Sequence, residues 1–459
     1  MPTAQAGISV QPPAEPAELL GQPEWTRPER GGDGQGLHIV RAVVDVIQEC
    51  NLRCLYCHPG KVWIKQHLDA EHVSAVFAAA ERYGLLELVI SGGEATLHPQ
   101  LPAILAATHQ LRQTAAVLIT NATKVDHDLV TAVAGSNLTR ICVSLDGPDG
   151  PTHGSARGRN FPRVLDGLRR LGGAGKPITV ISVVHKQNFR RLPELSAMLA
   201  EAGLVSQHHL CAPSFSGTAR EHYGRLKLDW DDYLTVQQAV DAAHAELIGR
   251  GLYVTFNSFW PAIGQRSLHV NNARTITLQQ LSEQAKDSLV NVRPNGEFRI
   301  NATTWGRETI GNAVIGNVRH EDPEALLWAA EQQFRDGSLG QLPREVEAVH
   351  KFQLGRQASQ QATNAIIDSD ANPSSLAELI PIRPLSAHWL LDNPLDRAEL
   401  ADIAARARRS QSSFRFLRHA SGVHLLFDKP RSHVTLLTEP EWQQFAASMT
   451  RPAGVEDAR

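Results

Sequence analysis

Three cysteines near residue 50 are the side chains of this sequence best suited to chemistry. Cys50, Cys54 and Cys57 follow the spacing C-x3-C-x2-C within one short run. Thiolate sulfur is a soft ligand that suits iron, and three thiolates on one loop can bind three corners of a 4Fe-4S cube. The fourth iron then lacks a protein ligand, and an open metal position can take a substrate or a cofactor. The spacing therefore predicts a 4Fe-4S cluster with one reactive iron.

A structural zinc site is the alternative interpretation, with His58 or a distant residue as fourth ligand. Structural zinc sites usually combine two C-x2-C-like pairs, and the sequence holds no second pair. The remaining cysteines, Cys142 and Cys211, are isolated in the sequence. A disulfide role is therefore disfavoured as well.

Two further motifs follow the cysteines in the sequence. Ser91-Gly-Gly-Glu94 comes after an apolar run, and Val143-Ser-Leu-Asp-Gly147 precedes His153 and Arg157-Gly158. With these motifs the chain resembles the radical S-adenosylmethionine (radical SAM) superfamily over residues 38–225. In that family the cluster chelates the methionine part of SAM at its open iron. The resemblance thus implies SAM as a second cofactor, bound beside one 4Fe-4S cluster.

The resemblance also implies roles for the residues of these motifs. Gly92, Gly93 and Glu94 would receive the SAM amino group, since glycines allow close approach where a side chain would collide. Arg157 would meet the SAM carboxylate, because a guanidinium fork matches that group. The ordinary alternatives are a tight turn at the glycines and an exposed arginine.

Four more residues are candidates for contacts with SAM. Ser144 and Asp146 could contact the ribose, and Tyr56 could lie against the adenine. Asn121 resembles the family's Thr-Asn-Gly run, although Ala122 replaces the glycine. A surface turn at Asp146 and a packed loop aromatic at Tyr56 are the alternatives.

From residue 38 onward, apolar runs alternate with helical patterns. Strands are predicted at 38–47, 86–90, 115–120, 140–145, 178–184 and 206–211, and helices at 71–83, 101–110, 126–133, 161–171 and 192–202. This alternation favours an α/β fold, namely a partial (β/α)6 TIM-type barrel. The motifs fall at or just after strand ends, where the loops of such barrels build active sites.

The chain is expected to contain five parts, four of which are a tail, the barrel, a linker and a C-terminal module; the fifth, residues 230–320, is an extension of the barrel. Residues 1–36 are rich in Pro, Gly, Gln and Glu, which predicts a disordered tail, and residues 37–229 form the barrel. A helical linker is expected at 321–380 and a small α+β module at 381–459. That module could recognise a leader peptide or another partner, or act as a structural cap.

Residues 230–320 resemble the SPASM or twitch-type extension of peptide-maturing radical SAM enzymes. In that family the extension carries cysteines that bind auxiliary clusters, and here it carries none. Asn295-Gly296 within it predicts a β-hairpin. The segment is therefore expected to be a degenerate extension that shapes a substrate pocket.

Composition excludes several partners. The formal net charge is -3 over 459 residues, with no long basic run, which disfavours nucleic acid. No apolar stretch approaches the roughly 18 to 20 residues that cross a bilayer, and the N-terminus lacks a signal-peptide pattern. The sequence therefore predicts a cytoplasmic protein without a membrane partner.

These observations predict a radical SAM enzyme that cleaves SAM to a 5'-deoxyadenosyl radical and abstracts hydrogen from a substrate. A ribosomally synthesised peptide in natural-product maturation is the first choice of substrate. A sugar, nucleoside or other small secondary metabolite is the alternative, and a non-catalytic metal-binding regulator is the alternative outside enzymes. A flavodoxin or ferredoxin would supply the electron. Cys211, at the end of the sixth strand, could donate a hydrogen atom or could be a buried, unreactive thiol.

Overall fold

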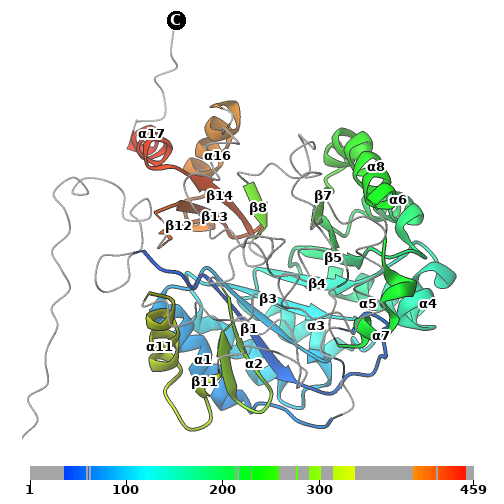
Figure 1. The fold of residues 1–459 in the computed structure, drawn as a ribbon, viewed down its shortest axis with the longest axis horizontal. Helices are drawn as coiled ribbons and strands as arrows, with labels where there is room; N and C mark the ends of the chain where they lie inside the picture. Colours follow the sequence, from blue (N-terminus) through cyan, green and yellow to red (C-terminus); the bar gives the residue numbers. More distant parts are fainter. Residues whose placement is uncertain are drawn as a thin grey trace, which may run out of the picture.

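The computed structural model describes residues 36–57, 60, 64–211, 213, 217–228, 230–257, 275–277, 289–300, 314–335, 395, 397–419 and 422–450. Its main feature is a ten-stranded sheet in the order β11-β10-β9-β1-β2-β3-β4-β5-β6-β7 (Figure 1). Nearly all of the predicted tail, and residues 336–394 of the predicted linker and module, lie outside the described residues.

Six parallel strands form the centre of this sheet and confirm the predicted partial barrel. They are β1 Arg41–Ile47, β2 Glu87–Gly92, β3 Ala115–Thr120, β4 Arg140–Ser144, β5 Ile178–Val183 and β6 Gln207–Cys211. The helices between them are α1 Ala70–Tyr83, α2 Leu101–Ala107, α3 His127–Ala134, α5 Phe161–Gly172 and α6 Leu192–Ala202. The strands alternate between an outer face that packs on these helices and an inner face that lines the barrel.

The structure adds one helix and one strand that the sequence patterns did not indicate, although they predicted a helical stretch after the sixth strand. A short helix, α4 Gly150–Arg157, precedes α5, with Asp149 accepting the Thr152 N–H at its start. After α7 Thr218–Leu226 and α8 Trp230–Gly249, a seventh strand, β7 Tyr253–Asn257, pairs in parallel with β6.

The extension supplies three more strands beside β1. Strand β9 Leu289–Val292 runs parallel to β1, and β10 Glu297–Ile300 turns back against β9. The predicted hairpin is confirmed, with Gly296 at φ +86° in the left-handed region that favours glycine. Strand β11 Val314–Asn317 completes the edge.

Helix α11 Pro323–Arg335 packs against α1 and also contacts β11 at this edge of the sheet. Rings of Tyr83 and Trp328 lie 4.8 Å apart. The Glu331 carboxylate accepts the backbone N–H of His38 at 3.1 Å, that of Ile39 at 3.2 Å and the Tyr83 hydroxyl at 2.7 Å. This part of the predicted linker is thus built into the barrel wall where the chain enters β1.

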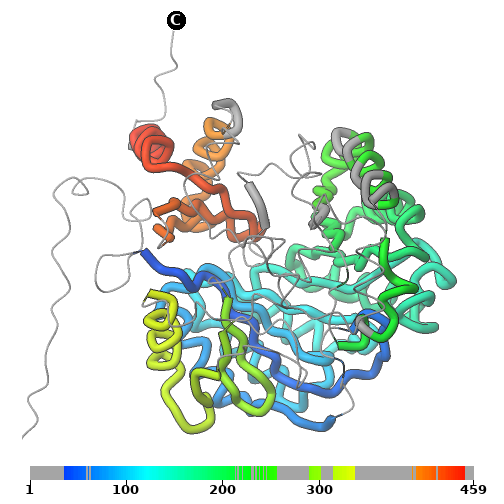
Figure 2. Tube along the Cα trace, viewed as in Figure 1, coloured from blue at the N-terminus to red at the C-terminus, as the bar shows by residue number. Residues whose placement is uncertain are grey.

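The C-terminal module is α+β, as predicted. It contains α16 Arg397–Arg409, β12 Phe414–Arg418, β13 His424–Asp428, β14 His433–Leu437 and α17 Glu439–Thr450. A distant segment, β8 Thr275–Thr277, joins it as the fourth strand of the sheet β12-β13-β14-β8. Figure 2 shows the module in orange and red beside the barrel.

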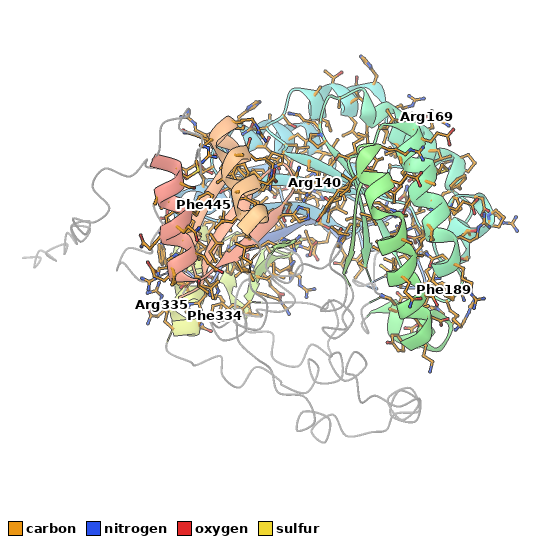
Figure 3. The ribbon with its side chains drawn as sticks, turned by 90° about the horizontal axis from the view of Figure 1, so that it is seen from above. Arg140, Arg169, Phe189, Phe334, Arg335 and Phe445 are labelled. Atoms are coloured by element: carbon orange, nitrogen blue, oxygen red, sulfur yellow. The ribbon has the colours of Figure 1, made fainter. Side chains whose placement is uncertain are left out.

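The module covers the amino ends of the barrel strands. Ser432 donates to the Glu87 carboxylate at the start of β2, and the Arg140 Nη1 donates to the Arg431 carbonyl at 2.9 Å. In Figure 3, Phe445 of the module and Phe189 of the barrel lie on opposite sides of the molecule, and Arg140 lies between them. Among the described helices, none combines the length and apolar character needed to span a membrane.

Candidate active site at the carboxyl ends of the strands

The loop after β1 carries the three cysteines of the motif. Its backbone is tied to the neighbouring helices, since Leu55 N–H donates to the Ala156 carbonyl at 2.9 Å and Thr218 N–H donates to the Cys57 carbonyl at 2.9 Å. Within the described residues, no three His, Cys, Asp or Glu side chains are grouped to hold a metal ion. A 4Fe-4S cube does not need three side chains grouped around a single ion, because each thiolate binds a different iron.

The three thiols are partly buried, and burial controls their ionisation. It raises the pKa of Cys50 to about 12, that of Cys54 to about 11, and also that of Cys57. Thiolates here therefore need a compensating cation, and a bound metal would displace the thiol protons. Three soft donors on one loop fit a 4Fe-4S cluster.

Gly92 and Gly93 lie against the backbone that enters the cysteine loop. Gly93 N–H donates to the Ile47 carbonyl at 2.7 Å, and Glu94 N–H donates to the Glu49 carbonyl at 2.9 Å. A Cβ on Gly92 would lie 2.3 Å from the Ile47 oxygen, and one on Gly93 would lie 2.4 Å from the Glu49 oxygen. The close approach that requires these glycines is thus to the protein's own chain, and it joins two of the predicted motifs.

The Glu94 carboxylate is buried and held by several donors. Oε1 accepts the Thr96 hydroxyl at 2.8 Å and the Thr120 hydroxyl at 2.6 Å, and Oε2 accepts the Asn121 N–H at 2.7 Å. Thr96 N–H adds a further bond to Oε1 at 3.1 Å. These bonds fix the carboxylate, and among the described residues Oε2 keeps capacity for another donor.

Asn121 connects Glu94 to the cysteine loop. Its side-chain Nδ2 donates to the Asn51 Oδ1 at 2.9 Å and lies 3.9 Å from the Cys50 Sγ, while Oδ1 accepts the Thr123 N–H at 3.0 Å. Ala122, where the family has glycine, adopts φ +53°. The departure from glycine thus leaves a non-glycine residue in a left-handed conformation.

Tyr56, Asp146 and Arg157 form one buried network. Asp146 is fully buried, and its Oδ2 accepts the Tyr56 hydroxyl and, at 2.8 Å, the Arg157 Nε. Asp146 is therefore no surface turn. Arg157 is 8% exposed, and its Nη1 lies 3.9 Å from the Cys54 Sγ. Burial acts to lower the pKa of Arg157, but Asp146, Tyr56 and Cys54 raise it overall, so the guanidinium stays charged.

Ser144 and Cys211 end their strands on the inner face of the barrel. Along β4, Ser144 follows Arg140 and Cys142 with the period of two that places side chains on one face, and along β6 Cys211 follows Gln207 and His209 in the same way. The Cys211 Sγ lies 3.6 Å from the Ser182 carbonyl oxygen. The SAM-binding roles and the hydrogen-donor role stay predictions.

His153, Asn188 and Val183 also hold this network, through contacts with Asp146. The His153 Nδ1 accepts the Asp146 N–H at 3.2 Å, Asn188 Nδ2 donates to the Asp146 carbonyl at 2.9 Å, and Val183 N–H donates to Oδ1 at 3.0 Å. In the sequence, His153 belongs to the third motif, and Asn188, after the fifth strand, is a further candidate of the same kind as Asn121. Their partner could not be identified without the fold.

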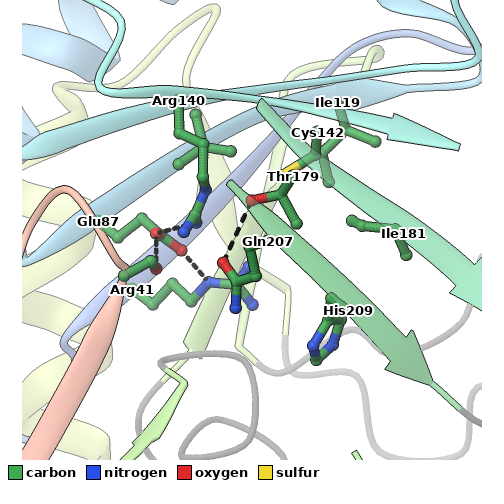
Figure 4. Close-up of a pocket in the computed structure, with 11 residues that line it drawn as sticks. Arg41, Glu87, Ile119, Arg140, Cys142, Thr179, Ile181, Gln207 and His209 are labelled. Carbon is green, nitrogen blue, oxygen red and sulfur yellow. Dashed lines mark hydrogen bonds and ion pairs between the residues drawn. The ribbon is translucent and has the colours of Figure 1, made fainter. Parts of the chain in front are cut away.

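A cavity lies at the opposite, amino end of the barrel (Figure 4). Arg41 and Arg140 both contact the Glu87 carboxylate there, at 2.9 and 3.3 Å, and Thr179 donates to Gln207 at 3.2 Å. An apolar layer that includes Val89, Val117 and Cys142 lies between this cavity and the other end. The cavity is therefore separate from the cysteine loop.

Comparisons with known proteins agree with this geometry. A family model described as the radical SAM superfamily matches residues 44–199. The Fe-coproporphyrin III synthase of Methanosarcina barkeri is 29% identical over 163 residues, which are 35% of this chain and 40% of that protein. The PqqA peptide cyclase of Gluconobacter oxydans is 28% identical over 166 residues, 35% of this chain and 46% of that protein. The match thus spans less than half of each relative.

Solved structures share the fold. SuiB of Streptococcus suis bound to S-adenosylmethionine has a TM-score of 0.53 at 17% identity, covering 66% of this chain and 68% of SuiB. The protein anSMEcpe with bound AdoMet and the Cp18Cys peptide has a TM-score of 0.50 at 14% identity, covering 74% of this chain and 99% of anSMEcpe. At these identities the likeness shows the fold alone. Residues 44–199 of this chain therefore form a domain that matches the radical SAM superfamily.

Proposed function

We propose that this protein binds a 4Fe-4S cluster through Cys50, Cys54 and Cys57 and uses it with SAM to modify a substrate by radical chemistry. The observation that carries the proposal is the junction of the two motifs. Two backbone bonds fasten Gly93 and Glu94 to the residues that lead into the cysteine loop. This junction brings a fixed carboxylate next to the predicted ligand loop, as chelation of SAM requires.

The protein's share of the reaction is positioning. When bound, the cluster supplies one electron that cleaves SAM to methionine and a 5'-deoxyadenosyl radical, which takes a hydrogen atom from the substrate. Glu94 Oε2 would accept the SAM ammonium, since its other oxygen is already saturated by Thr96 and Thr120. Arg157 Nη2 would meet the SAM carboxylate. Ser144, on the inner face, would contact the ribose.

Asp146 and Tyr56 are better suited to hold Arg157 than to touch SAM. Both Asp146 oxygens are occupied, by Tyr56, Arg157 and Val183. The Tyr56 ring has the Arg157 guanidinium over it, 5.1 Å from the ring centre. We therefore reassign these two residues from direct ribose and adenine contacts to support of Arg157.

A peptide is the substrate class we propose. The partial sequence similarity to the PqqA peptide cyclase supports it, as does the extension β9–β11 that flanks β1. A small metabolite is the second candidate, because the probable GTP 3',8-cyclase of Methanococcus aeolicus is 25% identical over 191 residues. A flavodoxin or ferredoxin would deliver the electron.

Anaerobic reconstitution with iron and sulfide tests the proposal. The wild-type protein should bind about four irons per chain and release 5'-deoxyadenosine when SAM and dithionite are added. Cys54→Ala should lose the cluster and this product. A colourless protein that binds zinc and leaves SAM intact would contradict the proposal and favour a metal-binding regulator.

Cys142→Ala is the matched control. Cys142 is a buried thiol in the apolar layer of the barrel, away from the cysteine loop. This variant should retain full iron content and product formation, so that loss in Cys54→Ala reports ligation and not the removal of any buried thiol. Incubation with short peptides and with nucleotides would then separate the two substrate classes.

A further inference from the structure

A buried cation lies beside one of the three predicted cluster ligands. The Arg157 Nη1 is 3.9 Å from the Cys54 Sγ, and its Nε is bonded to Asp146 at 2.8 Å. Among the described residues, the donors to the Cys50 sulfur are neutral, namely the Leu52 N–H at 3.4 Å and the Asn121 amide at 3.9 Å. The described donors to the Cys54 and Cys50 sulfurs therefore differ in charge.

The surroundings of Arg157 make this charge effective. Tyr56 and Arg157 are each 8% exposed, and Asp146 is not exposed at all. Tyr56 packs with Ala156, Ala219 and Leu226 in a small apolar cluster against which Cys54 lies. Charges interact strongly in such a desolvated place, because little water is present to screen them.

We propose that Arg157 raises the reduction potential of the cluster through a charge-assisted N–H to sulfur bond with the Cys54 thiolate. Reduction adds negative charge to a cluster, and hydrogen bonds and positive charge near its sulfurs stabilise the reduced form. Asp146 acts as a positioning residue, which orients the guanidinium and neutralises part of its charge. This inference rests on the proposed function, because it requires the cluster.

The two roles expected of Arg157 are compatible. Its described bonds use Nε and Nη1, and Nη2 has no partner among the described residues. A contact from Nη2 to the SAM carboxylate would thus leave the bond to Cys54 in place. The effect on the cluster should therefore be measurable in the absence of SAM.

Substitutions at Arg157 and Asp146 should shift the potential in opposite directions. Arg157→Gln removes the cation and should lower the equilibrium constant for reduction about tenfold, which is 59 mV for a one-electron couple. Asp146→Asn leaves the cation without its counter-charge and should raise the potential. Arg157→Lys keeps the charge without the planar fork and should give an intermediate value.

A redox titration followed by EPR on the reconstituted protein, without SAM, measures these shifts. Asn121→Ala is the comparison variant, since it removes a neutral donor near Cys50 and should change the potential less than Arg157→Gln. An unchanged potential in Arg157→Gln, or shifts of equal sign in Arg157→Gln and Asp146→Asn, would overturn the inference. A purely structural role would not produce opposite signs.

Iron content separates this inference from the proposed function. Absence of a cluster from the wild-type protein would overturn both the proposed function and the tuning role of Arg157. Full iron content with unshifted potentials would overturn only the tuning role. If Arg157→Gln fails to take up iron, Arg157→Lys and Asp146→Asn still decide between an electrostatic and a structural role.

Discussion

The two ends of the barrel each bury an arginine–carboxylate network, but the networks differ in what they contact. At the carboxyl ends, Arg157 connects Asp146 to the sulfur of Cys54. At the amino ends, Arg41 and Arg140 both contact the Glu87 carboxylate, which also accepts the Ser432 hydroxyl of the C-terminal module. The same ion-pair chemistry thus serves a predicted ligand loop at one end and a packed interface at the other.

The amino end contains an excess of positive charge. Two guanidinium groups face one carboxylate there, and burial together with Arg140 and Arg41 lowers the pKa of His209 to about 3, so its ring is neutral. The module docks on this network from the end opposite the cysteine loop. Its position agrees with a structural cap, the second of the two roles expected for it.

The largest effect is expected at the junction of the motifs. Gly93→Ala would place a Cβ 2.4 Å from the Gln48 and Glu49 carbonyl oxygens. These are backbone atoms, which cannot rotate away as a side chain could. The variant should keep its fold, as circular dichroism would show, but lose most of its iron on reconstitution. Wild-type iron content would contradict the junction's role.

Gly224→Ala is the matched control for that substitution. Gly224 lies in α7 with open space where its Cβ would be. Alanine in a helix is favoured over glycine by about 0.5 to 1 kcal/mol. This variant should load iron normally and should not lower the free energy of unfolding.

The next largest effect should be on stability at the amino end. Glu87→Gln leaves the Arg41 and Arg140 charges buried without a counter-charge, and removing one partner of a buried pair costs about 3 to 5 kcal/mol. Urea unfolding should show this loss, whereas the cluster potential should stay at the wild-type value. A shift in potential as large as that of Arg157→Gln would erase the distinction between the two ends.

A smaller, pH-dependent effect is expected where α11 meets the start of β1. Burial acts to raise the pKa of Glu331, but bonds from His38 and Tyr83 lower it overall from 4.5 to about 2. Because the folded pKa lies below the unfolded one, this stabilisation is complete above about pH 5 and is lost as the pH falls toward 2.

Comparison of wild type with Glu331→Gln by urea unfolding tests this assignment. The stability lost by wild type on acidification should exceed that lost by the variant, by up to about 3 kcal/mol between pH 5 and pH 2. Parallel pH profiles for the two proteins would show that Glu331 is not responsible. Binding of SAM by the reconstituted protein at neutral pH should be unaffected.

Local sequence patterns were sufficient to predict much of the barrel. The six central strands were predicted from apolar runs, and the hairpin from Asn295-Gly296, because both signals lie within a few consecutive residues. Helix α4 was missed because its Gly-Pro-Thr-His-Gly sequence has low helix propensity and depends on the Asp149 cap.

Features that depend on distant pairing could not be predicted. Strand β8 joins a sheet formed by residues 414–437, and β7 adds to β6 across α7 and α8. Asp146 was assigned to ribose or to a turn because its partners Arg157 and Val183 lie 11 and 37 residues further along the chain. Only the fold shows that they surround it.

We propose that the cysteine loop holds a cluster whose open iron takes SAM. EPR of the reconstituted, dithionite-reduced protein, recorded with and without SAM, tests it most directly. Chelation of SAM should change the g values of the reduced cluster, and the change should be absent after Glu94→Gln. A spectrum that SAM does not alter, or a protein without any cluster signal, would contradict the account.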